Sequence, residues 1–253
     1  MVSTYDLIVA GLSVFLSLGT VVVCLKYGRF LRYIFLNLYL LVSASHTVGS
    51  LYIIKQYGYD SLTYFYFYYT WDAVGSIIGY VLVASFFDQM FRLSAFRPYV
   101  RPTLALFFLG ILVVTGVFVS RNLGQPYFYS RFANEFQQNM FFVGVLLTFL
   151  LWISMTYVRS ESRRFVLLVS GLGIYFSAHA VNYALQFLLK SDAATAVLTK
   201  VPPIAYTVMV SLWLYTFLRV PEGEPAYIPS REIGRATAEK PAYVVASAGR
   251  GQH

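Results

Sequence analysis

The sequence predicts an all-α polytopic membrane protein, in which a bundle of seven transmembrane helices precedes a polar tail. Hydrophobic residues make up 58% of the 253 positions and charged residues 12%, whereas soluble domains carry about 25% charged residues. Seven apolar runs follow one another, and a bilayer core ~30 Å thick needs ~20 apolar helical residues to span it. All 19 Lys and Arg residues lie outside the runs, as expected when lipid surrounds them.

The seven apolar runs are residues 7–25, 33–54, 64–87, 102–120, 140–158, 165–189 and 201–218. Each of the first three runs is bounded by features typical of a membrane span. Asp6 precedes the first run and no basic segment does, so we expect a retained span and not a cleaved signal peptide. The second run follows a basic loop with Arg29 and Arg32. The third opens with a cluster of aromatic residues typical of the membrane interface, and its Gly75 and Gly79 have the spacing that permits close helix packing.

The last four runs are separated by loops of contrasting length. Short basic loops precede the fourth and sixth runs, whereas the longest loop precedes the fifth. The polar residues Glu135, Gln137 and Gln138 lie near the end of that long loop. We expect them to begin a helix at the interface; the alternative is that they rim a pocket. The seventh run opens with Pro202 and Pro203, which a helix accepts in its first turn.

The distribution of basic residues predicts the orientation of the bundle. Fourteen of them follow the first, third, fifth and seventh runs. The other five are Lys55, Arg121, Arg131, Lys190 and Lys200. The positive-inside rule then places the N-terminus outside and the C-terminus in the cytoplasm of a multi-pass cell-membrane protein. This asymmetry also accounts for the net charge of +8 without a nucleic-acid partner.

Residues 221–253 form a polar tail that we expect to be disordered. The tail contains Pro-Ala-Tyr followed by an aliphatic residue twice, around Tyr227 and Tyr243. Two such copies could bind a cytoplasmic protein partner, although a compositionally biased tail can repeat a short string by chance. A second repeat is longer: 15–46 and 149–179 run alike from Phe to His. It raises the hypothesis of parallel three-helix repeats joined by the fourth helix, as in some transporters.

Three ionisable groups are predicted deep within the bundle. His46 and His179 lie 13 and 14 residues above the basic ends of their runs, which is ~20 Å at 1.5 Å per residue. Asp72 lies 8 residues into the third run from the other side, and so at a similar level in the outer half of the bilayer. Each belongs to a polar stripe at helical spacing, and such stripes avoid lipid. Buried ionisable groups in a membrane are candidate functional residues.

These residues favour a small-ligand site over catalysis. We expect Asp72, His46 and His179 to be polar anchors, Trp71 and Tyr68 to be aromatic walls, and two further polar residues to complete the site. Those two residues are Ser43 and Asn182. The sequence contains no evident nucleophile–base pair or phosphate-binding loop, so an enzyme is disfavoured. A non-enzymatic sensory or ligand-binding module is therefore the leading hypothesis.

Two alternatives remain open. His46 and His179 could ligate a haem b between two helices, in a membrane subunit for electron transfer, and a metal site would need Asp72 as a further ligand. Otherwise the polar groups hold helices together in a structural or assembly subunit. Retinal is disfavoured because the seventh run contains no central lysine; Lys200 lies at its edge, beside two prolines.

Overall fold

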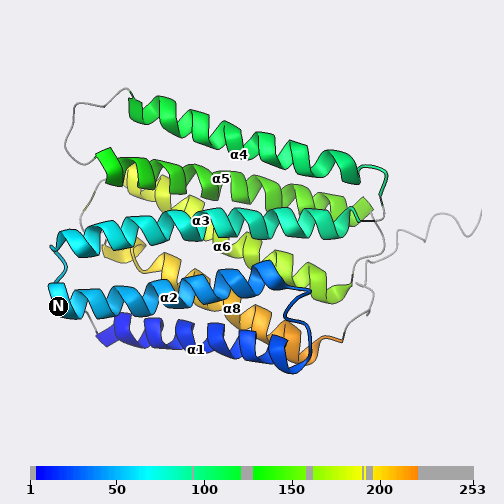
Figure 1. Ribbon diagram of the computed structural model, residues 1–253, viewed down its shortest axis with the longest axis horizontal. Coiled ribbons are helices and arrows are strands. Elements are labelled where there is room, and N and C mark those ends of the chain that lie inside the picture. The colour runs from blue at the N-terminus through cyan, green and yellow to red at the C-terminus, as the bar shows by residue number, and fades with distance from the viewer. Residues whose placement is uncertain are drawn as a thin grey trace, which may run out of the picture.

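The computed structural model contains seven long helices that lie side by side (Figure 1). It describes residues 4–92, 94–120, 128–157, 162–189, 191 and 196–221. The helices are α1 (Thr4–Lys26), α2 (Ile34–Tyr57), α3 (Leu62–Met90), α4 (Arg97–Ser120), α5 (Phe128–Tyr157), α6 (Arg163–Leu189) and α8 (Val201–Arg219). The predicted tail beyond Pro221, with Tyr227 and Tyr243, lies outside the described residues, so its disorder and its partner stay predictions.

The seven helices confirm the predicted fold class. Within the described residues, seven helical segments are long and apolar enough to cross a membrane. Large apolar side chains point outward from them: Phe15, Leu106 and Phe149 are 73%, 70% and 64% exposed. A soluble protein would bury such side chains, whereas a membrane protein places them against acyl chains. The molecule is therefore a multi-pass membrane protein in contact with lipid.

Six helices pack into a closed ring, and α4 lies outside it. Each ring helix contacts the next in the order α1, α2, α3, α5, α6, α8 and back to α1. α4 packs against α5 and more sparsely against α3, and it lies at the edge of the bundle in Figure 1. The ring encloses the polar stripes of its members, which places the candidate site at its centre. The three-helix repeat stays a prediction, since a ring in chain order arises with or without one.

Local sequence explains the connection that positions α3 beside α2. Gly58 adopts a φ of 81° immediately after α2, a conformation that residues with a side chain rarely adopt. Ser61 then caps α3, and its side chain accepts a hydrogen bond of 3.1 Å from the backbone N–H of Tyr64. The tight turn brings together the halves of the two helices that adjoin it, and these halves contain His46 and Asp72.

α5 begins earlier than its apolar run. The run starts at Met140, whereas the helix starts at Phe128. The first turns therefore include the polar residues Gln137 and Asn139. Asn139 donates a hydrogen bond of 3.0 Å to the hydroxyl of Thr115 in α4, and this contact helps to hold α4 against the ring. Because a hydropathy pattern records only apolar stretches, it does not detect a helical segment whose polar side chains are paired within the bundle.

The centre of the ring is packed with aromatic side chains. Trp213 of α8 is fully buried, and its indole N–H donates a hydrogen bond of 2.9 Å to the carbonyl of Leu168 in α6. The ring of Tyr39 lies 6.3 Å from that of Trp213 and 6.4 Å from that of Tyr206. Ser17 of α1 and Tyr206 share a hydrogen bond of 3.0 Å. These contacts link α1, α2, α6 and α8.

We expect Gly144→Ala to destabilise the bundle. A Cβ atom at Gly144 would lie 2.9 Å from the ring of Phe176, which is 5% exposed and has little room to move. Overpacking of this kind costs about 1–3 kcal/mol, measurable as a lower free energy of unfolding in detergent. Gly116→Ala is the matched control, because nothing lies within 4 Å of a Cβ there. Equal stability of the two variants would contradict the close α5–α6 packing.

Candidate functional site

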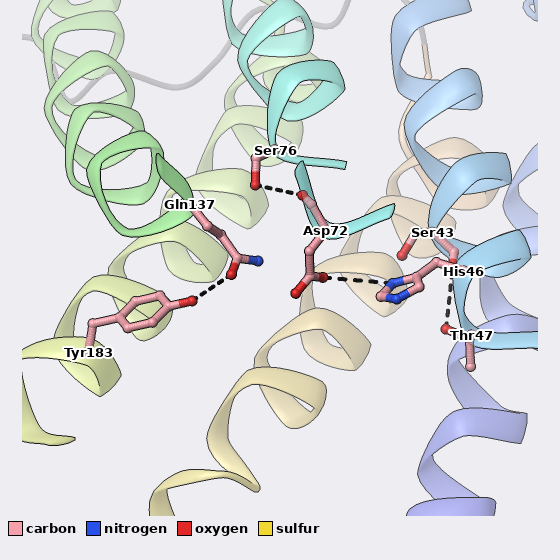
Figure 2. A network of polar contacts seen from close by, with 7 residues as sticks. All are labelled: Ser43, His46, Thr47, Asp72, Ser76, Gln137 and Tyr183. Atoms are coloured by element: carbon pink, nitrogen blue, oxygen red, sulfur yellow. Dashed lines mark hydrogen bonds and ion pairs between the residues drawn. The ribbon is translucent and has the colours of Figure 1, made fainter. Parts of the chain in front are cut away.

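A carboxylate and an imidazole meet across α2 and α3. The His46 Nδ1 and Asp72 Oδ1 atoms lie 3.9 Å apart, and Figure 2 shows the two side chains pointing toward each other. Their side chains are 22% and 16% exposed, so both remain partly accessible from outside the bundle. At 3.9 Å the two groups form a long ion pair only when His46 is protonated, and the carboxylate keeps the capacity to accept further hydrogen bonds.

Polar side chains from α3 and α5 surround the Asp72 carboxylate. Tyr68 and Gln137 present donor groups to it. Gln137 is held in turn, because the Tyr183 hydroxyl donates a hydrogen bond of 2.7 Å to its Oε1 atom. That bond orients the Gln137 amide nitrogen toward Asp72, as Figure 2 shows. The hydroxyl of Ser76 donates to the backbone carbonyl of Asp72 at 2.9 Å and does not contact the carboxylate.

His46 and Asp72 line a small cavity inside the ring. Its volume is about 70 Å³, compared with about 150 Å³ for a cavity that holds benzene. The lining residues are Tyr39, Val42, Ser43, His46, Trp71, Asp72, Gly75, Ser76, Gly79, Gln137, Phe141, Tyr175 and Phe176. Among these described residues there is one carboxylate and no Lys or Arg. The cavity has room for a few waters or for a ligand of about two or three heavy atoms.

Four of the predicted site residues line this cavity, and a fifth lies beside it. Ser43, His46, Trp71 and Asp72 are lining residues. The Tyr68 ring lies 5.6 Å from that of His46 and packs beside it. Gly75 and Gly79 also line the cavity, and a Cβ atom at Gly79 would lie 3.5 Å from the ring of Tyr39, in agreement with the close packing expected there. Nothing lies within 4 Å of a Cβ atom at Gly75, so its missing side chain creates space.

His179 and Asn182 lie behind the cavity wall. The His179 ring stacks on Phe141 at 4.0 Å between centroids and meets Tyr175 edge-on at 4.5 Å. Neither His179 nor Asn182 is a lining residue. Asn182 is 4% exposed, and its Oδ1 atom has no hydrogen-bond partner within the described residues. His179 therefore shapes the site through Phe141 and Tyr175, and the predicted convergence brings together only His46 and Asp72.

α5 contributes more to the cavity than the sequence predicts. The sequence predicts that Gln137 begins an interfacial helix, with a pocket rim as the alternative, and it does not single out Phe141. Both line the cavity. They are four residues apart, so they lie on one face of a helix. That spacing was the available signal, but it becomes visible only if the helix is extended back through its polar first turns.

Comparison with known proteins leaves the family open. No protein-family model, no curated protein and no solved structure matches this chain. The chemistry of the cavity therefore has to be argued from its own residues.

The cavity geometry gives no support to the metal and haem alternatives. No cluster of three or more His, Cys, Asp or Glu residues suited to a metal occurs in the described ranges. A haem held by His46 and His179 would have to occupy the space between them, where Phe141 stacks directly on His179. A cavity of about 70 Å³ is smaller than one that holds benzene, and a porphyrin is several times larger than benzene. These residues do not fit a haem in this arrangement.

Proposed function

We propose that this protein is a small-ligand-binding membrane module whose ligand is a small cation, of ammonium or methylammonium size, held by Asp72. The observation that carries the proposal is a single carboxylate facing a cavity of about 70 Å³ that no Lys or Arg lines within the described chain. Ionisable groups inside a membrane bundle are costly and commonly mark ligand or ion sites. This proposal gives the polar pocket a ligand of defined charge and size.

Charge balance favours a cation over a neutral ligand. An ionised carboxylate in a low-dielectric interior needs a compensating positive charge or strong hydrogen-bond donors. Tyr68 and Gln137 supply donors, and His46 supplies a positive charge only when it is protonated, from 3.9 Å away. A cation inside the cavity would approach Asp72 more closely than His46 does and would form charge-assisted hydrogen bonds.

The aromatic walls favour an ammonium ion over a metal ion. Trp71, Tyr39, Phe141 and Tyr175 line the same cavity. Aromatic faces attract ammonium groups through cation–π interactions worth about 0.5–2 kcal/mol each, whereas Na⁺ or Mg²⁺ would require several oxygen ligands. The volume limits the ligand to about two or three heavy atoms. Methylammonium satisfies both limits.

Asp72→Asn is expected to remove the binding. Purified full-length protein in detergent should bind methylammonium saturably in calorimetry, and the substitution should weaken binding at least ~10-fold, because Asn keeps the size of Asp but not its charge. Na⁺ at the same concentration should compete weakly. Asp60→Asn is the matched control, since Asp60 is exposed in the loop before α3 and does not line the cavity.

A second variant separates volume from charge. Gly75→Val adds a side chain toward the cavity, where a Cβ atom meets nothing within 4 Å, so the protein should fold and still lose methylammonium binding. Gly116→Val in α4 is its control, because Gly116 is exposed and its Cβ position is equally open. Binding that survives in both Asp72→Asn and Gly75→Val would place the ligand elsewhere and refute the proposal.

A further inference from the structure

A second, larger concavity lies outside the helical ring. It has a volume of about 1490 Å³ and lies among the beginning of α2, the second half of α3 and the first half of α4. None of its lining residues lines the Asp72 cavity. It arises because α4 packs mainly on α5 and only sparsely on α3. We call it the α3–α4 groove.

α3 and α4 are in direct contact near the end of the groove that lies away from the arginines. The Tyr80 hydroxyl of α3 donates a hydrogen bond of 2.5 Å to the carbonyl of Leu104 in α4. The rings of Tyr80 and Phe108 lie 5.3 Å apart, so the two helices meet at this level. From there the groove runs toward the arginine-rich end of the bundle.

The groove wall is apolar and open to lipid. Phe35 and Ile77 line it and are 40% and 39% exposed. Val81, Ala84 and Ala105 continue the apolar wall between them. At membrane depth such a surface has to be covered by hydrocarbon, since water is absent there. An acyl chain is the occupant that this wall fits.

The mouth of the groove is strongly positive. Among the described residues, four arginines line it, namely Arg32, Arg92, Arg97 and Arg101, against one carboxylate, Asp88. Asp88 is engaged by Arg101 through an ion pair of 3.1 Å. Arg92 and Arg97 therefore add positive charge at one end of the apolar wall, just as the phosphate of a phospholipid lies at one end of its acyl chains.

We propose that the α3–α4 groove binds one anionic glycerophospholipid, with its phosphate among the arginines and an acyl chain along α3. Basic pockets between transmembrane helices attract anionic head groups, and the apolar wall adds a contact that a free anion cannot make. The positive-inside prediction places this end in the cytoplasmic leaflet, where anionic lipids are concentrated. A zwitterionic phospholipid has no net charge to match the groove mouth.

Lipid titration followed by native mass spectrometry tests the proposal on the purified full chain. Dioleoyl phosphatidylglycerol should bind more tightly than dioleoyl phosphatidylcholine in a first, saturable step. One basic residue near an anionic head group contributes about five-fold in affinity. Arg92→Gln combined with Arg97→Gln should therefore weaken phosphatidylglycerol binding about 25-fold and leave phosphatidylcholine binding unchanged. Both side chains are exposed, so folding should not depend on them.

Two controls test charge location and groove shape. Lys26→Gln combined with Arg219→Gln removes two exposed charges at the same end of the bundle but away from the groove, and it should leave lipid binding unchanged. Ala105→Trp fills the wall without changing charge and should weaken binding of phosphatidylglycerol. Equal affinities for the two lipids, equal losses in both double variants, or displacement of the lipid by inorganic phosphate alone would each overturn the proposal.

Discussion

Trp213→Ala is expected to lower the free energy of unfolding by about 3–5 kcal/mol, the range for deleting a fully buried aromatic side chain. The substitution removes a side chain with 0% exposure together with its hydrogen bond to Leu168. The indole packs so closely on Gly171 that a Cβ atom at this glycine would lie 2.9 Å from the indole nitrogen. The substitution therefore also leaves an empty space beside Gly171. Packing contacts remain stabilising in a membrane even where the hydrophobic effect between helices is weak. Denaturation with SDS measures the change.

Trp152→Ala is the matched control for this prediction. Trp152 of α5 also donates an indole hydrogen bond, of 3.3 Å to the hydroxyl of Ser170, but it is 49% exposed. Its removal should cost about 1 kcal/mol, the typical contribution of one hydrogen bond. If both substitutions have the same effect, the α6–α8 contact is not the centre of the packed core.

Arg164→Ala is expected to release the end of α8 from the start of α6. The Arg164 side chain is 1% exposed, and its Nε atom donates a hydrogen bond of 3.1 Å to the carbonyl of Val220. A second donor, Nη2, reaches the same oxygen, and the guanidinium lies over the ring of Phe217. Loss of charged hydrogen bonds and an unsatisfied carbonyl should cost about 2–3 kcal/mol. Hydrogen exchange at the C-terminal turn of α8 should rise.

The neighbouring arginine gives a sharp comparison. Arg163 has the same chemistry and sits one position earlier, but it is exposed, and exposed charges contribute little to stability. Arg163→Ala should therefore leave the free energy of unfolding unchanged within about 0.5 kcal/mol. Arg164→Lys should recover only part of the loss, because an ammonium lacks the planar fork that places two donors on one oxygen. Equal effects at both positions would contradict the burial of Arg164.

The fold class was predictable because lipid imposes a simple rule on composition. A span needs a minimum length of apolar sequence, and that length is visible without any knowledge of packing. The rule does not extend to α5, where Gln137 and Asn139 belong to the helix. Their side chains are satisfied by Tyr183 and Thr115, and these partners come from distant parts of the chain. The position of α4 outside the ring could not be predicted either, since hydropathy does not specify which helices pack against each other.

The candidate site was predictable only in part. Helical spacing places His46 and Asp72 on inward faces, and the short α2–α3 turn makes these two helices neighbours. The same spacing places His179 on an inward face, but Phe141 and Tyr175 pack against it. Depth and face do not determine which side chain fills the space between two helices. The orientation, the tail and the ligand stay predictions.

Cys24 offers a practical route to the predicted orientation. It is the one cysteine in the chain, and its side chain is fully shielded among neighbouring helices. A membrane-impermeant maleimide should thus find no reactive thiol in the native protein. Single cysteines introduced at Asp60 or Arg219 could then be labelled in intact cells without prior removal of native cysteines. The position that reacts identifies the end of the molecule that faces the outside of the cell.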